Sequence, residues 1–100
     1  MKKDIDFLDY LFKMIEKKAK SKDKNSYTKF LLKNGKNKIA QKVSEESSEL
    51  IIDYLNGTKK RTIEEASDLI YHLLVMLYSK KINLNDIKKE LKKRENVRSK

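Results

Sequence analysis

Proline is absent from this 100-residue chain, and glycine occurs only at Gly35 and Gly57. β-Hairpins and β-sandwiches use both residues at their many turns, so a chain this poor in them is badly suited to a β fold. Long helices joined by few loops need neither residue in their interior. The sequence therefore predicts an all-α fold, a small bundle of four to five helices that forms a single domain over residues 1–100.

Apolar periodicity places these helices along the chain. Leu8, Phe12 and Ile15 recur at spacings of four and three residues, which is typical of a helix with one buried face. The other segments have similar patterns with recognisable capping residues. The first expected helix covers about 4–19 with Asp4 or Asp6 at its start, and a short second helix follows Ser26 and stops at Asn34-Gly35. The third covers about 38–55 and is closed by Gly57, and the fourth is capped by Thr62 and runs through Leu77. The last helix begins at Asn83, and its end, residues 95–100, should fray.

The net charge of +10 makes nucleic acid a partner to consider. Residues 17–42 carry ten lysines and one aspartate, and residues 80–100 carry nine basic and three acidic residues, whereas residues 43–58 carry four acids and no base. Basic flanks around an acidic centre also suit a small anionic ligand held through a metal ion. Neither interleaved aromatic residues nor an arginine-rich helix supports nucleic-acid binding. We expect no nucleic-acid partner and keep a non-catalytic, basic nucleic-acid-binding protein as an alternative.

Composition also bears on location. The chain has no cysteine, which excludes disulfides and fits a reducing compartment. The first residues, MKKDIDFLDY, carry acids at positions 4, 6 and 9, too many for the core of a signal peptide. The uncharged run near residue 70 is too short to span a bilayer. We therefore expect a cytoplasmic protein that does not associate with membranes.

Carboxylates on two neighbouring predicted helices lie at the border of the core rather than opposite it. On a helical wheel of about 100° per residue, Ile39, Val43, Leu50 and Tyr54 mark the apolar stripe of the first of these helices. Acids that merely face solvent would lie on the other side of the wheel. The polar residues beside the apolar stripes are Glu46, Glu49 and Asp53 on the first helix, with Glu45 just beyond Glu49, and Glu65, Asp68 and His72 on the second.

A short connection makes these two helices an antiparallel hairpin. At about 1.5 Å per residue, Glu49 lies about 12 Å before Gly57 and Asp68 about 9 Å after Thr62, so the acidic pairs should face one another. Carboxylates held close together repel, and a divalent cation is one remedy. Oxygen ligands of this kind select Mg²⁺ or Mn²⁺ over zinc. The pattern E-E-x-x-E followed by E-x-x-D thus suggests a metal-dependent enzyme that acts on phosphates.

The carboxylates also have structural interpretations. Thr62-x-x-Glu65 is a capping box, which by itself would explain Glu65. Glu45 and Glu49 could pair with nearby lysines on a solvated face. Two facing pairs at the core border nevertheless favour a metal site over these separate explanations.

Three further residues near the acids are candidates for binding. Lys42 shares the face of the acids and could meet a phosphate, although a simple ion pair explains it equally well. Tyr27 could contact a ligand or pack in the core. His72 fits the edge of the core better than a metal site, since hard cations rarely need imidazole.

The segments KVSEESSELI and EEASDLIYHLLVML resemble the phosphoribosyl-ATP pyrophosphohydrolase family, one of the MazG-like all-α nucleotide pyrophosphohydrolases. SYTKFLLKNG, KIAQKVSEE and INLNDIKKEL extend the resemblance over nearly the whole chain. The acidic pattern is common to the superfamily, whereas the SYT, IAQKV and DLIYHLLV segments favour the specific family. Ser44 stands where the family has Gly, and Ser47 where Ala is usual; both are small and fit a helix.

The resemblance implies Mg²⁺-dependent hydrolysis of phosphoribosyl-ATP to phosphoribosyl-AMP and pyrophosphate, the second step of histidine biosynthesis. It implies a stand-alone enzyme and, together with the thin core, a homodimer. Mn²⁺ is a possible substitute cation. Matched by motif position, the metal ligands would be Glu46, Glu49, Glu65 and Asp68, and Glu45 would bind a further ion or orient the attacking water. A house-cleaning NTP pyrophosphatase of the same superfamily is the alternative.

Overall fold

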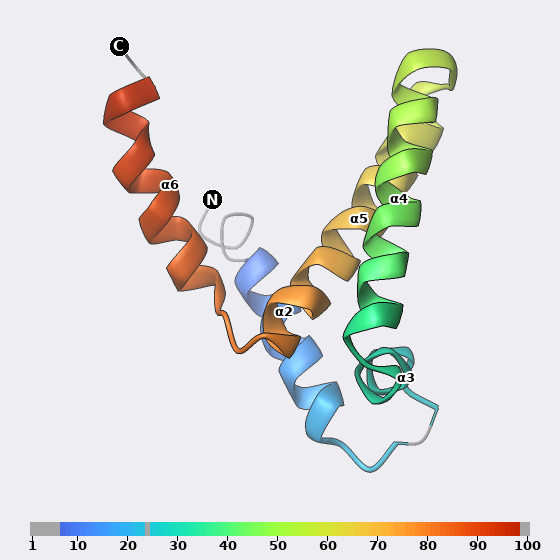
Figure 1. Cartoon of the computed structure of the whole chain (residues 1–100), viewed down its shortest axis with the longest axis vertical. Coiled ribbons are helices and arrows are strands. Elements are labelled where there is room, and N and C mark those ends of the chain that lie inside the picture. The colour runs from blue at the N-terminus through green and yellow to red at the C-terminus, as the bar shows by residue number, and fades with distance from the viewer. Residues whose placement is uncertain (1–6, 24, 99–100) are drawn as a thin grey trace.

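Residues 7–23 and 25–98 are described by the computed structural model, and over these residues the chain forms five α-helices and no strand. This confirms the all-α prediction for the described part of the chain. None of the helices searched there is long and apolar enough to cross a membrane. In chain order, the helices in Figure 1 are α2 (Phe7–Lys20), α3 (Tyr27–Asn34), α4 (Lys36–Asn56), α5 (Lys59–Ser79) and α6 (Leu84–Arg98).

The long helices α4 and α5 form the predicted antiparallel pair. Each has 21 residues, and only Gly57 and Thr58 connect them, so they run back alongside one another (Figure 1). The N–H of Gly57 donates to the carbonyl of Asp53 at 2.8 Å and closes α4. A connection this short fixes the register of the two helices, and with it the depth at which their side chains meet.

The prediction that Thr62 caps α5 is wrong. The hydroxyl of Thr58 accepts the N–H of Arg61 at 3.1 Å, so α5 begins one turn earlier. Thr62 lies inside the helix, with its hydroxyl 2.9 Å from the Thr58 carbonyl and 3.2 Å from the Asp53 carbonyl. Both threonines are suitable caps, and the lysines and arginine between them are good helix formers, so the helix extends back to the first. The capping-box explanation of Glu65 therefore does not hold.

The predicted boundaries between α3 and α4 are close to those observed. Ser26 accepts the N–H of Lys29 at 3.2 Å, as expected of an N-cap. Gly35 ends α3 and donates to the carbonyl of Leu31 at 3.2 Å. Its φ of 89° and ψ of −179° are open essentially to glycine alone, so α4 can start immediately afterwards, at Lys36 rather than near 38.

At the two ends of the chain, only some of the predicted helix boundaries can be compared with the structure. The expected start of the first helix, with Asp4 or Asp6 as its cap, lies outside the described residues. At α6 the side chain of Asn83 accepts the N–H of Asp86 at 2.9 Å, and the Asp86 carboxylate accepts the N–H of Asn83 at 3.1 Å. This reciprocal cap confirms the predicted start. The helix continues to Arg98, so residues 95–98 are helical, and fraying of the tail stays a prediction.

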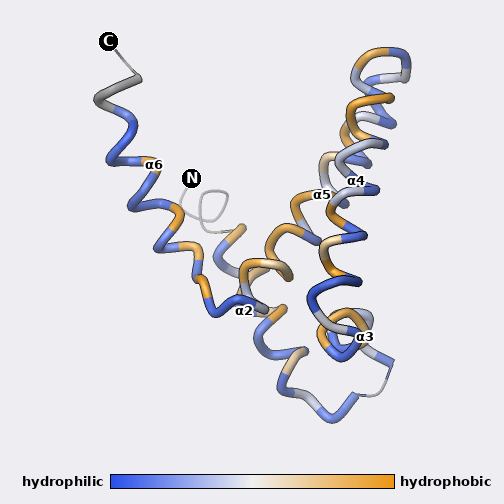
Figure 2. The backbone as a smooth tube through the Cα atoms, viewed as in Figure 1, coloured by the Kyte–Doolittle hydropathy of each residue, from blue (hydrophilic) through white to orange (hydrophobic). Residues whose placement is uncertain are grey.

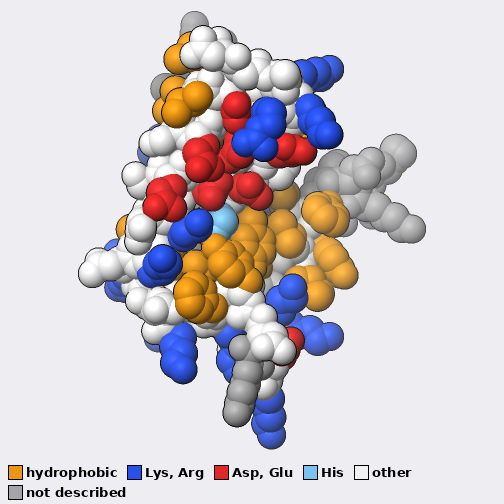
Figure 3. Space-filling view, turned by 90° about the vertical axis from the view of Figure 1, so that its right-hand side faces the viewer, with side chains coloured by type: hydrophobic (Ala, Val, Ile, Leu, Met, Phe, Trp, Pro, Cys, Tyr) orange, Lys and Arg blue, Asp and Glu red, His pale blue; other side chains and the backbone are white. Residues whose placement is uncertain are grey.

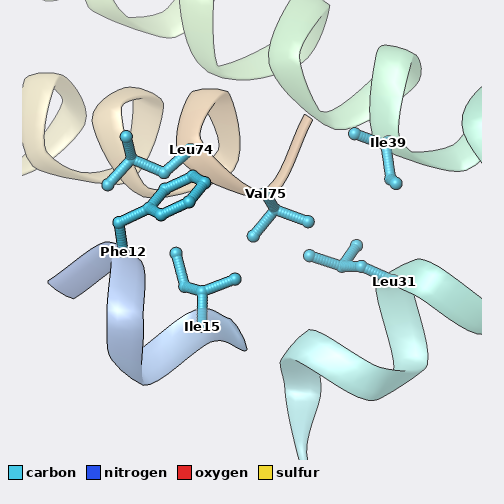
Figure 4. Close-up of a cluster of buried hydrophobic side chains, with 6 residues drawn as sticks. All are labelled: Phe12, Ile15, Leu31, Ile39, Leu74 and Val75. Carbon is cyan, nitrogen blue, oxygen red and sulfur yellow. The ribbon is translucent and has the colours of Figure 1, made fainter. Parts of the chain in front are cut away.

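The core is small and lies where four helices meet. Figure 4 shows that Phe12 and Ile15 of α2 point toward Leu74 of α5 and toward residues of α3 and α4. Half-buried side chains surround this cluster. The buried apolar residues are Phe12, Ile15, Leu31, Ile39, Leu74 and Val75.

The loop end of the α4–α5 hairpin extends away from this core (Figure 1). Of the stripe predicted for α4, Ile39 is buried and Val43 and Leu50 are half-buried, but Tyr54 is 75% exposed. Its assignment to the core is wrong because, at this distance from α2 and α3, only α5 remains to pack against α4. Figure 2 shows apolar stretches continuing along both helices into this end of the hairpin.

Candidate metal centre

Three carboxylates from two helices converge midway along the hairpin. Glu46 and Glu49 lie one turn apart on α4, and Glu65 lies on α5. One carboxylate oxygen from each residue lies within 4.8 Å of the other two. Glu46 is 8% exposed and Glu65 is 5% exposed, whereas Glu49 is open to solvent. Three of the residues expected at the core border are thus brought together at a half-buried site.

The electrostatics of this cluster are unfavourable when all three acids are ionised. Burial above all, together with the neighbouring Glu49, raises the pKa of Glu65 to about 7, although the positive charge of Arg61 opposes this rise. In addition, the Oε1 atoms of Glu46 and Glu65 are buried without a hydrogen-bond partner among the described residues. Buried oxygens without partners are rare and costly. A divalent cation with oxygen ligands would satisfy both atoms and offset the repulsion, so the donor set fits Mg²⁺ or Mn²⁺.

Figure 3 shows the surroundings of these acids on one face of the molecule. Acidic side chains form a patch directly beside the single histidine, His72, and an apolar area lies on the other side of that histidine. Basic side chains border the acidic patch. This face therefore combines negative, positive and apolar surface within a short distance.

Lys42 is one of the basic residues beside the cluster. Its ammonium lies 3.8 Å from the Glu46 carboxylate and 3.6 Å from that of Glu45. Burial alone would lower the pKa of Lys42, but Tyr27, Glu45 and Glu46 outweigh it, and the pKa is raised. The ion-pair interpretation of Lys42 agrees with these distances, and a contact with phosphate stays a prediction.

Glu45 and Asp68 are not part of the three-carboxylate group. The side chain of Glu45 is 46% exposed; it accepts a hydrogen bond from Gln41 at 3.0 Å, which together with Lys42 lowers its pKa. Asp68 lies one turn beyond Glu65 on α5 and is exposed. The roles expected of both residues stay predictions.

Tyr27 and His72 join α3 to the edge of the site. The Tyr27 hydroxyl lies 2.8 Å from Nε2 of His72, and Nδ1 of His72 lies 2.8 Å from the backbone carbonyl of Asp68. Burial raises the pKa of Tyr27, so its hydroxyl stays protonated at neutral pH. His72 is 6% exposed, in agreement with the structural interpretation, whereas Tyr27 is 43% exposed and stacks on Tyr71 and Phe30.

The family model described as phosphoribosyl-ATP pyrophosphohydrolase matches residues 8–95 of this chain. The chain belongs to this family. A phosphoribosyl-ATP pyrophosphatase from Clostridium botulinum is 45% identical over 87 residues, which cover 87% of the chain and 79% of that protein. One of the same name from Sulfolobus acidocaldarius is also 45% identical, over 87% of the chain and 92% of its own length. The match to the histidine biosynthesis bifunctional protein HisIE of Bacteroides thetaiotaomicron is 46% identical, and the chain spans 43% of that relative.

In this phosphoribosyl-ATP pyrophosphohydrolase family member, Arg61 is a site residue that the sequence analysis did not single out. Its Nη2 lies 2.9 Å from Oε2 of Glu65 and 3.8 Å from the Asp53 carboxylate, and its Nη1 lies 3.1 Å from Glu64. The guanidinium thus occupies one oxygen of Glu65 and leaves Oε1 as the atom without a partner. Its spacing of three and four residues before Glu64 and Glu65 was the available signal.

Proposed function

We propose that this chain hydrolyses phosphoribosyl-ATP to phosphoribosyl-AMP and pyrophosphate, the second step of histidine biosynthesis. The observation that carries the proposal is the family match over residues 8–95. Two relatives named phosphoribosyl-ATP pyrophosphatase support it, because the chain covers 79% and 92% of their lengths. The bifunctional relative, of which the chain spans 43%, carries less weight for the activity of the whole protein.

Mg²⁺, with Mn²⁺ as a substitute, is the proposed cofactor. Glu46, Glu49 and Glu65 are the proposed ligands, and Asp68 is the fourth by its place in the family's acidic motif. Support comes from the three oxygens within 4.8 Å and from the two buried oxygens that have no partner. When bound, such a cation supplies Lewis-acid chemistry and offsets negative charge on phosphate oxygens.

The chain's own residues would orient the reacting groups. Glu45 is exposed enough to meet water, and its lowered pKa keeps it ionised, so its carboxylate can accept a hydrogen bond from the attacking water and orient it. The ammonium group of Lys42 lies close to the carboxylates of both Glu45 and Glu46, and its positive charge can hold a phosphate oxygen. A further ion bound by Glu45 is the alternative role for that residue.

A product analysis tests the proposed reaction. Purified protein with phosphoribosyl-ATP and Mg²⁺ should release pyrophosphate and phosphoribosyl-AMP, and a chelator should stop the release. A panel of ordinary and oxidised NTPs, assayed in parallel, should be turned over at least about 100-fold less efficiently in kcat/KM, a gap of about 2.7 kcal/mol in transition-state binding. Faster hydrolysis of any NTP would replace the proposal with a house-cleaning pyrophosphatase.

We also propose that the chain works as a homodimer. Among the residues whose burial is described, six apolar side chains form the buried core, which is thin for a domain of this length. Large apolar residues on both long helices are solvent-exposed, and a second copy would cover them. The exposed apolar residues on α4 and α5 are Ile51, Ile52, Tyr54, Leu55, Ile63, Ile70 and Leu73.

A further inference from the structure

His72 is a buried titratable residue for which the proposed hydrolysis has no use. It lies on α5, one turn after Asp68, and 6% of it is exposed. Its Nδ1 is 2.8 Å from the backbone carbonyl oxygen of Asp68. A carbonyl oxygen can only accept a hydrogen bond, so Nδ1 carries the hydrogen. In the neutral ring the other nitrogen, Nε2, is then an acceptor.

This assignment fixes the direction of the next hydrogen bond. The Tyr27 hydroxyl lies 2.8 Å from Nε2 of His72, so the hydroxyl must donate to it. The chain of bonds runs in one direction, from Tyr27 to His72 to the Asp68 carbonyl. The single hydrogen of the phenol is thereby directed toward α5, and only its oxygen lone pairs remain available to other groups.

The position of Tyr27 makes this direction relevant to a ligand. Its ring is 43% exposed and stacks on Tyr71 and Phe30, so the ring is held while one side stays open. Through His72, the Tyr27 hydroxyl is linked to the backbone of Asp68, a proposed metal ligand, so Tyr27 lies beside the candidate metal centre. Figure 3 shows His72 at the boundary between the acidic patch and the apolar area.

We propose that Tyr27 accepts a hydrogen bond from an O–H or N–H group on the sugar or base of the bound nucleotide, and that His72 is the positioning residue that fixes this role. Phosphate oxygens are acceptors, so a phenol whose hydrogen is already engaged has nothing to donate to them. Within a nucleotide, the groups that can donate to Tyr27 belong to the sugar and the base, so the Tyr27–His72 pair would recognise the nucleoside part of the ligand rather than its phosphates. The proposal rests on the proposed function for the identity of that nucleotide.

Steady-state kinetics with phosphoribosyl-ATP test the role of Tyr27. Y27F removes the acceptor oxygen and should raise KM about three- to tenfold, the effect of losing one neutral hydrogen bond, while kcat stays within about twofold. Y71F is the matched control, because Tyr71 bonds Thr28 across the same two helices and Phe retains its ring. It should lower the melting temperature and leave KM unchanged. An equal rise in KM for Y71F would show that loosening the contact between α3 and α5 is enough to raise KM. That result would overturn the proposal.

Variants of His72 separate positioning from packing. H72N keeps a donor near Nδ1 but has no acceptor for Tyr27, so its KM should rise as in Y27F, and the Y27F/H72N double variant should be no worse than either. H72Q places an amide oxygen near the position of Nε2 and should restore KM at least partly. Additive effects in the double variant, or no rescue by H72Q, would contradict the positioning role.

A substrate series identifies the donor group. With analogues that lack one sugar hydroxyl, the KM ratio between Y27F and wild type should fall to about one if that hydroxyl is the donor. A ratio that persists for every sugar analogue assigns the donor to the base. A Y27F phenotype in which only kcat falls, as expected for a contact with the reacting phosphates, would overturn the proposal.

One measurement does not depend on turnover. The ¹⁵N shifts of His72 at neutral pH should report hydrogen on Nδ1 and an unprotonated Nε2, and Y27F should shift Nε2. Hydrogen on Nε2 would overturn the proposal even if phosphoribosyl-ATP is hydrolysed. If wild-type protein fails to hydrolyse phosphoribosyl-ATP while His72 shows the expected tautomer, the proposed function fails, and the same kinetics are run on the nucleotide that it does hydrolyse.

Discussion

At the scale of single residues, Glu65 shows how a carboxylate is prepared for a cation. Its side chain is buried on α5, one oxygen is held by Arg61, and the other has no partner among the described residues. Burial and the neighbouring acids raise its pKa to about 7, so near neutral pH it takes up a proton readily. A divalent cation and a proton can each neutralise the negative charge of the Glu65 carboxylate. Binding of one at this carboxylate should therefore exclude binding of the other.

This raised pKa predicts how stability changes with pH. Without divalent cations, the contribution of Glu65 to the free energy of unfolding should be largest below its ordinary pKa of 4.5 and should be lost as pH rises to about 7. The reason is that, in this window, the folded protein binds a proton at Glu65 that the unfolded chain releases. Urea melts of wild type and E65Q between pH 4 and 8, in chelator, measure the difference. Equal pH slopes for both proteins would contradict the prediction.

Asp68 is the residue whose role depends most on its place in the family motif. D68N should reduce kcat/KM for phosphoribosyl-ATP by at least about 100-fold, because losing an outer partner of a metal ligand already costs about 10- to 100-fold and losing a ligand should cost more. The far-UV circular dichroism should not change, because the side chain is exposed and the substitution is nearly isosteric. E64Q is a suitable control, since Glu64 is exposed on the same helix and lies outside the three-carboxylate group. Full activity in D68N would remove Asp68 from the proposed ligands.

At the scale of secondary-structure elements, the site depends on the pairing of α4 with α5. Glu46 and Glu49 come from one helix and Glu65 from the other, and the two-residue connection at Gly57 and Thr58 sets their relative depth. A cation shared between these residues would link the two helices near their middle. Coordination of the cation by both helices would oppose the separation of α4 from α5.

Added Mg²⁺ should therefore stabilise the folded protein. At free Mg²⁺ about 100-fold above its dissociation constant, binding contributes about 2.7 kcal/mol, which for a domain of this size shifts the melting temperature by roughly ten degrees or more. Calorimetry with Mg²⁺, with chelator and with E46Q measures the effect. E46Q should lose most of the shift; a wild-type melting curve that does not respond to millimolar Mg²⁺ would count against the site.

At the scale of the whole molecule, burial is distributed unevenly. The apolar core gathers α2, α3 and the adjoining parts of α4 and α5, whereas the loop end of the hairpin presents large apolar side chains to solvent. Ile52 on α4 and Ile63 on α5 flank the connection and are 60% and 56% exposed. Exposed apolar surface of this kind is typical of an interface.

Light scattering at assay concentration should give the mass of a dimer. I52D should shift the population toward monomer, because a buried interface would have to desolvate the new carboxylate. N37D, near the other end of α4, adds the same charge at an exposed polar position and should leave the dimer intact. A wild-type monomer at the concentration used for kinetics would overturn the proposed assembly.

The sequence by itself determined the helices, most of their caps and the family. Local interactions decide these features, as at Ser26 and Gly35, where each cap depends on residues within one turn, and the acidic motif can be read without knowing what packs against it. The prediction from the sequence misplaced the start of α5, because Thr58 and Thr62 are equally suitable caps.

Only the tertiary structure decided which side chains meet. It brought Glu46, Glu49 and Glu65 within 4.8 Å and left Asp68 outside that group. It also exposed Tyr54, whose periodicity indicates burial. A helical wheel gives the direction of a side chain around one helix, whereas contact between helices depends on their separation, their register and where the covering elements end.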